Sequence, residues 1–337
     1  MSSIDAIRPA AAPSSTRGPF LLTIATLVCA SLTIVKGAMT SSTGSGMAYP
    51  DWPLSDGQLM PESSYTTLAG FFEHFHRLAA STTGLCALGL ALWLHFGRLG
   101  DARARVLAWL GGVLVLAQGV LGGVGVLLGK RPDVPAQLLA QPGASVLREP
   151  MTPVLTSVLH GTLAQLTFAT FAWLAYQLSE RYRRTAPVTT VPPGAGRKLA
   201  VFGLVMLVLQ TVLGAIARHA NSPHALWTHA GNALVVFFAA TIATAFAMGR
   251  LAAVPGIVGI CRTTVFLLIV QIALGFVALA IRNPAGKRQA NVENLWVAST
   301  ISLHVLIGAT LTMLMATLAA HVFRATRRDP EPAQASA

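Results

Sequence analysis

Four histidines stand at similar positions in apolar stretches of the sequence. His76, His160, His229 and His304 lie one in each even-numbered apolar run, towards the same end of the run. An ionisable side chain is costly in hydrocarbon, so such residues are candidates for a functional site. A single one could serve only to hydrogen-bond a neighbouring helix, but four at similar depth favour a shared role. Neutral imidazole is a good ligand for haem iron.

The pairing of these histidines favours haem over zinc. Zinc usually takes three or four protein ligands, whereas no carboxylate or thiolate accompanies His229 and His304. We therefore predict that two histidines in each half of the chain ligate haem iron. A porphyrin between helices also needs small residues beside it. The glycines available for this are Gly161, Gly231 and Gly308 near the histidines, and Gly122 and Gly123 on a facing helix.

One acidic residue distinguishes the two halves. Glu73 precedes His76 by three residues and shares its helix face, whereas Leu226 holds the matching place before His229. The acid predicts proton or cation chemistry at one site and a fixed cofactor at the other. In the alternative interpretation, Glu73 only forms an ion pair with Arg77, four residues on. Arg77 could instead hold a haem propionate.

The elements that position these residues are apolar. Of 337 residues, 53% are hydrophobic and 11% charged, against about 25% charged in ordinary soluble domains. This composition excludes a disordered chain and a typical soluble enzyme. Eight runs have the roughly 20 apolar residues that a membrane-spanning helix needs. They cover residues 20–41, 69–96, 105–128, 153–178, 199–217, 226–248, 263–281 and 295–322.

A repeated motif divides these helices into two units. Gln118–Gly122, Gln210–Gly214 and Gln271–Gly275 share the pattern Gln-x-x-Leu-Gly, and Thr33–Gly37 is a degenerate copy. We predict an all-α integral membrane protein of two pseudo-symmetric four-helix bundles, an arrangement in which each half often holds a site. The expected divisions are a tail 1–19, a bundle 20–180 with one haem site, a linker 181–198, a bundle 199–322 with the other haem site, and a tail 323–337.

The net charge of +12 reflects membrane topology. Fifteen of the 24 lysines and arginines fall in one set of loops and tails, which predicts that both termini are cytoplasmic. This clustering between apolar runs argues against a nucleic-acid partner. Loops 42–68 and 129–152 are then external, and glycines and prolines make the first a turn-rich lid over the first haem site. We also expect a residue at position 55 to be accessible from outside.

The ordered set of motifs resembles the heme A synthases of bacteria and mitochondria. The resemblance covers about residues 20–322. The matching residues are Thr43–Gly46, Pro50–Leu54, Glu73, His76 and Arg77, Gln118–Gly123, His160–Gln165, Gln210–Ala215, Arg218 and His219, His229 and His304.

The resemblance implies an enzyme that oxidises the C8 methyl of heme O to a formyl group, yielding heme A for cytochrome oxidase. It implies a heme b held by His229 and His304, the substrate haem bound by His76 and His160, and help from Glu73 in the chemistry. Arg77 and Arg218 are expected among the cofactor-binding residues.

The resemblance further implies a location in the cell (inner) membrane and a separate electron donor, which the sequence leaves open. Heme O synthase and a second copy of the chain are open as partners.

The sequence departs from the pattern of the related sequences in one loop. Related bacterial sequences often carry two cysteines around the Pro-Asp-Trp-Pro-Leu motif, where this chain has Tyr49 and Ser55. What replaces these thiols is open at this point. Two other functions also stay open, a diheme b-type electron carrier and a haem transporter or haem-handling protein. Neither needs an acid beside the ligand, so Glu73 is the feature that separates them from an enzyme.

Overall fold

The computed structural model describes residues 16–129, 151–188, 191–220, 222–281 and 295–326. Eight long helices are apolar enough to cross a membrane, which confirms the predicted all-α membrane fold. They are α1 (Arg17–Ser42), α3 (Leu68–Phe96), α4 (Ala102–Gly129), α7 (Met151–Leu178), α9 (Pro193–His219), α10 (Pro223–Arg250), α11 (Ile257–Ala280) and α12 (Leu295–Ala325). Two short helices, α2 (Ser63–Thr66) and α8 (Glu180–Arg184), lie in the connections.

Prolines and a capping residue set two helix starts that differ from prediction. Helix α9 was expected to begin near residue 199 but begins at Pro193, because proline fits the first turn, where its missing N–H would have no partner. Helix α10 begins at Pro223 after Ser222, whose hydroxyl accepts a hydrogen bond from the Ala225 N–H at 3.3 Å. Helix α8 and the start of α9 therefore occupy part of the stretch 181–198.

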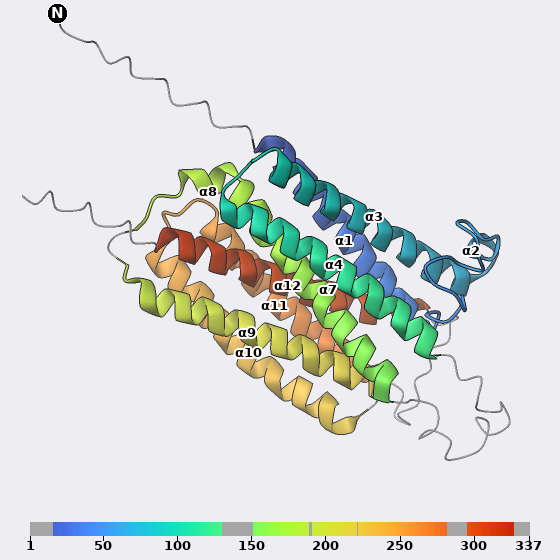
Figure 1. Ribbon diagram of the computed structural model, residues 1–337. Helices are drawn as coiled ribbons and strands as arrows, with labels where there is room; N and C mark the ends of the chain where they lie inside the picture. Colours follow the sequence, from blue (N-terminus) through green and yellow to red (C-terminus); the bar gives the residue numbers. More distant parts are fainter. Residues whose placement is uncertain (1–15, 130–150, 189–190, 221, 282–294, 327–337) are drawn as a thin grey trace, which may run out of the picture.

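Each half of the chain closes a ring of four helices (Figure 1). In the first half α1 packs on α3, α3 on α4, α4 on α7 and α7 on α1. In the second half the same order links α9, α10, α11 and α12. The halves meet through α7 against α12, α1 against α12 and α7 against α9. Exchanging each helix with its counterpart in the other half leaves this pattern unchanged.

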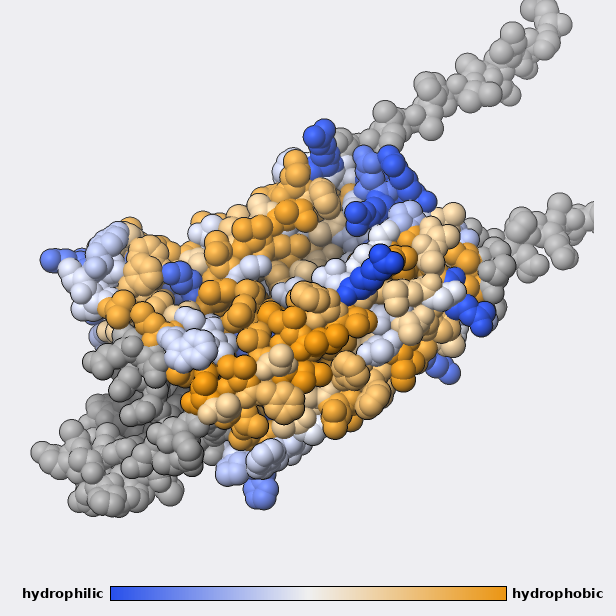
Figure 2. Space-filling view, turned by 180° about the vertical axis from the view of Figure 1, so that it is seen from behind, coloured by the Kyte–Doolittle hydropathy of each residue, from blue (hydrophilic) through white to orange (hydrophobic). Residues whose placement is uncertain are grey.

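The two ends of the molecule differ in charge. Helix α2 lies at one end, whereas α8 lies at the other, together with the start of α1 and the end of α12 (Figure 1). On the face that Figure 2 shows, apolar side chains cover most of the surface between the two ends. The α8 end carries the basic residues Arg17, Arg98, Arg103, Arg105, Arg181, Arg183, Arg184, Arg197, Lys198, Arg250, Arg262 and Arg324. The α2 end carries Asp51, Asp56 and Glu62.

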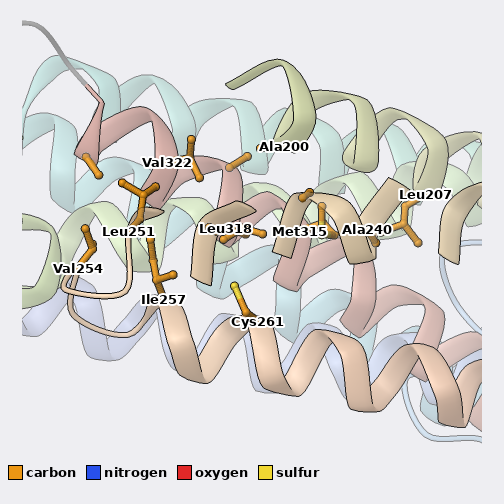
Figure 3. Close-up of a cluster of buried hydrophobic side chains, with 14 of the residues drawn as sticks. Ala200, Leu207, Ala240, Leu251, Val254, Ile257, Cys261, Met315, Leu318 and Val322 are labelled. Atoms are coloured by element: carbon orange, nitrogen blue, oxygen red, sulfur yellow. The ribbon is translucent and has the colours of Figure 1, made fainter. Parts of the chain in front are cut away.

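The apolar cores fill the half of each bundle near α8. In the second bundle the core includes Leu251, Ile257, Cys261, Met315 and Leu318 (Figure 3). The first bundle has a matching cluster from the late turns of α3 and α7 and the early turns of α4. The four predicted ligands, His76, His160, His229 and His304, lie in the opposite half of each bundle. Tight packing at one end thus fixes the helices that carry a polar site at the other.

Candidate functional site: two histidine pairs

The structure brings the four predicted ligands together as two pairs. His76 of α3 faces His160 of α7, with ring centroids 6.3 Å apart and ring planes at 78°. His229 of α10 faces His304 of α12 at the same 6.3 Å, with ring planes at 75°. Each bundle therefore holds one pair, contributed by its second and fourth long helices.

Main-chain carbonyl groups orient three of the four imidazoles. The Nδ1 atom of each of these three rings lies within hydrogen-bond distance of a main-chain carbonyl oxygen on the neighbouring helix. Because a carbonyl oxygen can only accept a hydrogen bond, Nδ1 carries the proton. The proton-free Nε2 is then the nitrogen able to bind a metal. The pairs are His76 with Thr33 at 3.1 Å, His160 with Gln118 at 3.0 Å, and His229 with Gln210 at 3.1 Å.

A glycine faces each imidazole from the same neighbouring helix. A Cβ atom at Gly37 would lie 2.7 Å from His76, and one at Gly214 would lie 2.8 Å from His229. Gly122 and Gly275 face the other two histidines, with a hypothetical Cβ 3.4 Å from each ring. These are the glycines of the repeated motif. In three of its four copies the first residue supplies the carbonyl for Nδ1, and in all four the glycine, four residues on, leaves room for the ring.

His304 differs from the other three. Its Nε2 lies 3.3 Å from the side-chain nitrogen of Gln271. Its Nδ1 and the Gln271 side-chain oxygen are buried without a hydrogen-bond partner among the described residues. A buried polar atom without a partner is costly, so the described residues alone do not satisfy this pair of side chains.

The expectation that glycines beside the histidines admit a porphyrin stays a prediction for Gly161 and Gly231. A Cβ at either position would meet no atom within 4 Å, so the space beside both glycines is open. Gly308 lies against Gln271, and Gly123 lies against the indole of Trp52. The motif glycines on the facing helix, by contrast, make room for the imidazole rings themselves.

The separation of the rings suits one metal ion in each pair. Imidazole nitrogens lie about 2.0–2.1 Å from a bound metal such as zinc, and ring centroids 6.3 Å apart are compatible with one ion held by a nitrogen of each ring. Across the described part of the chain, no three His, Cys, Asp or Glu side chains cluster as a metal site. A haem needs only two axial ligands, because the macrocycle supplies the rest of the coordination.

Glu73 and Arg77 join helix α3 to the loop 43–67. The Glu73 side chain is buried, and its Oε1 forms an ion pair with Arg77, as the alternative interpretation expected. Glu73 Oε2 accepts a hydrogen bond from the Tyr49 N–H at 3.1 Å. Arg77 Nη1 donates to the main-chain oxygen of Asp51 at 2.8 Å and to that of Leu54. One turn of α3 thus carries both a histidine of the first pair and the anchor of the loop.

Tyr49 and Ser55, which stand where related sequences often carry cysteines, also anchor this loop. Tyr49 and Ser55 are each 1% exposed. The Tyr49 hydroxyl accepts from the Ser63 hydroxyl at 3.1 Å, and the Ser55 hydroxyl lies 3.1 Å from Nδ1 of His74 on α3. Residue 55 is therefore shielded, and the expectation that it is accessible is wrong. Hydrogen bonds to α3 hold the loop where related sequences often carry thiols.

Arg218 links the two halves near the α2 end. From α9 its Nη2 donates to the main-chain oxygen of Ala38 at 2.9 Å and to the Ser42 hydroxyl at 2.7 Å, both on α1. Sequence analysis placed this residue among the cofactor-binding groups and did not predict the contact between the halves.

Comparison with known proteins identifies the family. The sequence pattern of the cytochrome oxidase assembly protein family COX15-CtaA matches residues 20–235. The chain belongs to this family. The match includes Glu73, Arg77, Arg218 and three of the paired histidines, whereas His304 lies beyond it.

Several relatives carry the name heme A synthase. The protein from Symbiobacterium thermophilum is 30% identical over 193 residues, which cover 56% of this chain and 55% of that protein. The protein from Bacillus licheniformis is 33% identical over 32% of this chain and 35% of its own length. That from Granulibacter bethesdensis is 37% identical over 28% and 26%. The chain thus spans about half the length of these relatives, or less.

Proposed function

We propose that this chain converts heme O to heme A by oxidising the C8 methyl group to a formyl group. One observation carries the proposal: the two histidine pairs have equal separations, but among the described residues only the helix of His76 also carries a buried carboxylate, Glu73. Two haem sites that served one purpose would not need to differ in this way. The relatives named heme A synthase support the same assignment.

The second pair is proposed to hold a resident heme b. A haem bound by His229 and His304 supplies electron transfer. The carbonyl of Gln210 keeps the proton of His229 on Nδ1, and Gly214 leaves room for its ring. The unpaired polar atoms of His304 and Gln271 favour the presence of a ligand at this site.

The first pair is proposed to bind the substrate heme O through His76 and His160. Glu73 lies three residues before His76 and is the acid nearest to it in the sequence of α3. In this position it could accept a proton or stabilise positive charge that develops at the oxidised carbon. The contacts of Arg77 favour a role in holding Glu73 and the loop over one in binding a propionate. For Arg218 we retain the cofactor-binding role.

We place the protein in the cell (inner) membrane with both termini cytoplasmic. The support is the concentration of arginines at the α8 end. Loop 43–67 is then external. The proposal requires a separate electron donor, and it includes heme O synthase and a second copy of the chain as partners.

The second candidate function is a diheme b-type electron carrier. The equal separation of the pairs and the ion pair of Glu73 with Arg77 favour it, because a neutralised acid has no need of a chemical role. A haem transporter or handling protein is a third class, in which neither haem would be held firmly.

Haem extraction distinguishes these functions. The protein is purified from cells with and without a heme O supply, and the extracted haems are separated by chromatography. We expect heme b in both preparations and heme A only with heme O present. Changing His229 or His304 to Ala should remove the low-spin b-type signal. Heme b alone under both conditions would overturn the enzyme and favour the carrier.

A further inference from the structure

The side chain of the loop residue Trp52 packs against helix α4, next to the place where His160 of the first pair also meets α4. A Cβ atom at Gly123 would stand 2.5 Å from the Trp52 indole, and one at Gly122 would stand 3.4 Å from the His160 ring. Consecutive residues of a helix differ in height by only about 1.5 Å. The indole and the imidazole therefore pack on neighbouring faces of α4 at the same level of the bundle.

Helix α3 fixes the chain on both sides of Trp52. Arg77 Nη1 donates to the carbonyl of Asp51, just before the tryptophan, and to that of Leu54, two residues after it. The Asp51 carboxylate accepts from the N–H groups of Asp56 and Gly57, each at 2.8 Å. The loop thus presents Trp52 in a defined place, while 41% of its surface is exposed.

The second half has a different arrangement at the matching place. Helices α9 and α10 are joined by only three residues, 220–222, so this connection is too short to form such a loop beside the second pair. In the repeated motif Phe276 stands where the first half has Gly123. An aromatic side chain fixed to α11 thus replaces one carried by a loop. Ala230 likewise stands where α3 has Arg77.

We propose that Trp52 contacts the heme O bound between His76 and His160, and that Arg77 positions Trp52 for this contact. This inference rests on the proposed function. A haem ligated by His160 extends beyond the imidazole on all sides, towards the face of α4 that Trp52 covers. A flat indole makes favourable stacked or edge contacts with a flat aromatic ring. The loop-borne side chain suits a ligand that must enter and leave, whereas the second site keeps its cofactor.

Equilibrium binding tests this contact without turnover. Full-length protein is purified from cells that lack heme O, placed in lipid nanodiscs, and titrated with heme O without oxygen or reductant. The absorbance change on ligation gives the Kd. We expect Trp52→Ala to raise the Kd about tenfold and Trp52→Phe, which keeps a smaller ring, about threefold. The matched control is Trp227→Ala, which removes an exposed tryptophan near the second pair and should leave the Kd unchanged.

The b-type signal of the second pair reports folding in every variant. Wild-type protein that binds no heme O would overturn the proposed function and this inference with it. Wild-type binding with an unchanged Kd in Trp52→Ala would overturn the contact alone. If Trp52→Ala loses the b-type signal and has therefore not folded, Trp52→Phe provides the test instead. A wild-type Kd for heme O in Trp52→Phe would then overturn the contact.

A double-mutant cycle tests the role of Arg77. If Arg77 acts by positioning Trp52, Arg77→Gln weakens heme O binding, and adding Arg77→Gln to Trp52→Ala weakens it no further. Fully additive effects would show that Arg77 acts independently of Trp52 and would overturn its positioning role.

Discussion

At the scale of single residues, the site depends on glycine as much as on histidine. An imidazole binds a metal well only when its ring is oriented and its proton sits on the other nitrogen. In three of the four cases a carbonyl provides the orientation, and in all four a glycine provides the space. Sequence analysis detected the motif that contains these glycines but could not assign its role, because spacing along one helix does not show which side chain faces it from another.

Gly214→Ala should weaken haem binding at the second pair by about 10- to 100-fold, the usual effect of disturbing the support of a metal ligand. The new Cβ would lie 2.8 Å from the His229 ring, so the ring must move. Haem titration followed by absorbance measures the loss. Gly249→Ala is the control, because a Cβ there, at the other end of α10, meets no atom within 4 Å. Equal behaviour of the two variants would show that the close approach is unimportant.

Glu73→Gln should lower heme A production by about 10²-fold or more, the scale of a lost acid–base group. The amide oxygen can still accept from the Tyr49 N–H, so the loop anchor is partly retained. Haem occupancy and the Kd for heme O should stay near the wild-type values. Full heme A production would refute the chemical role and leave Glu73 as the partner of Arg77.

At the scale of elements, the eight spanning helices could be predicted because length and hydropathy define them. Short elements could not. Helix α2 has only four residues, and its place depends on contacts such as that between Ser63 and Tyr49. The burial of Ser55 was mispredicted for the same reason. A polar residue in a loop rich in glycine and proline is usually exposed, and only the fold reveals the partner His74.

The orientation of loop 43–67 can be tested with a cysteine in place of Leu59, which is 78% exposed. In a protein whose three native cysteines are replaced, Leu59→Cys should react with an impermeant thiol reagent applied from outside the cell. Ser55→Cys should react much more slowly because the position is buried. Arg103→Cys, at the α8 end, should require permeabilisation. The reverse pattern for positions 59 and 103 would invert the topology.

The Asp51 turn should be sensitive to acid. The N–H of Gly57, with that of Asp56, stabilises the carboxylate and holds the pKa of Asp51 below its ordinary value. A carboxyl with a lowered folded-state pKa stabilises the fold above its unfolded pKa, about 3.9, and this stabilisation is lost as the pH falls through the folded value. Hydrogen exchange of residues 51–58 should therefore show constant protection from pH 7 to about 4 and less protection below. Asp51→Asn should remove this pH dependence, and an equal response in both proteins would contradict the assignment.

At the scale of the whole molecule, polar side chains join the two bundles. The side-chain oxygen of Gln165 on α7 accepts from Thr211 on α9 at 2.8 Å and from Thr312 on α12 at 3.3 Å. Arg218 makes a second link, to α1. Hydrogen bonds of this kind between membrane helices contribute about 0.6 kcal/mol each.

Thr211→Val should therefore lower the free energy of unfolding by about 0.6 kcal/mol. Combining it with Thr312→Val should cost more than the sum, because the Gln165 side-chain oxygen then loses both of its donors. Denaturation in mixed detergent measures these values. Thr170→Val is the control, since that hydroxyl bonds within its own helix, and a similar loss in the control would mean that the links between the bundles add nothing.

The contact pattern has a consequence for the origin of the chain. Because exchanging the halves leaves it unchanged, the surface through which the bundles meet is one that pairs with its own equivalent, as in a twofold homodimer. A four-helix unit with such a surface could pair with an identical copy before any second sequence existed. Duplication and fusion of its gene would then join the two copies covalently. The sequences of the two copies could afterwards change independently. One copy could keep a closed cofactor site while the other gained a loop, an acid and an exchangeable ligand.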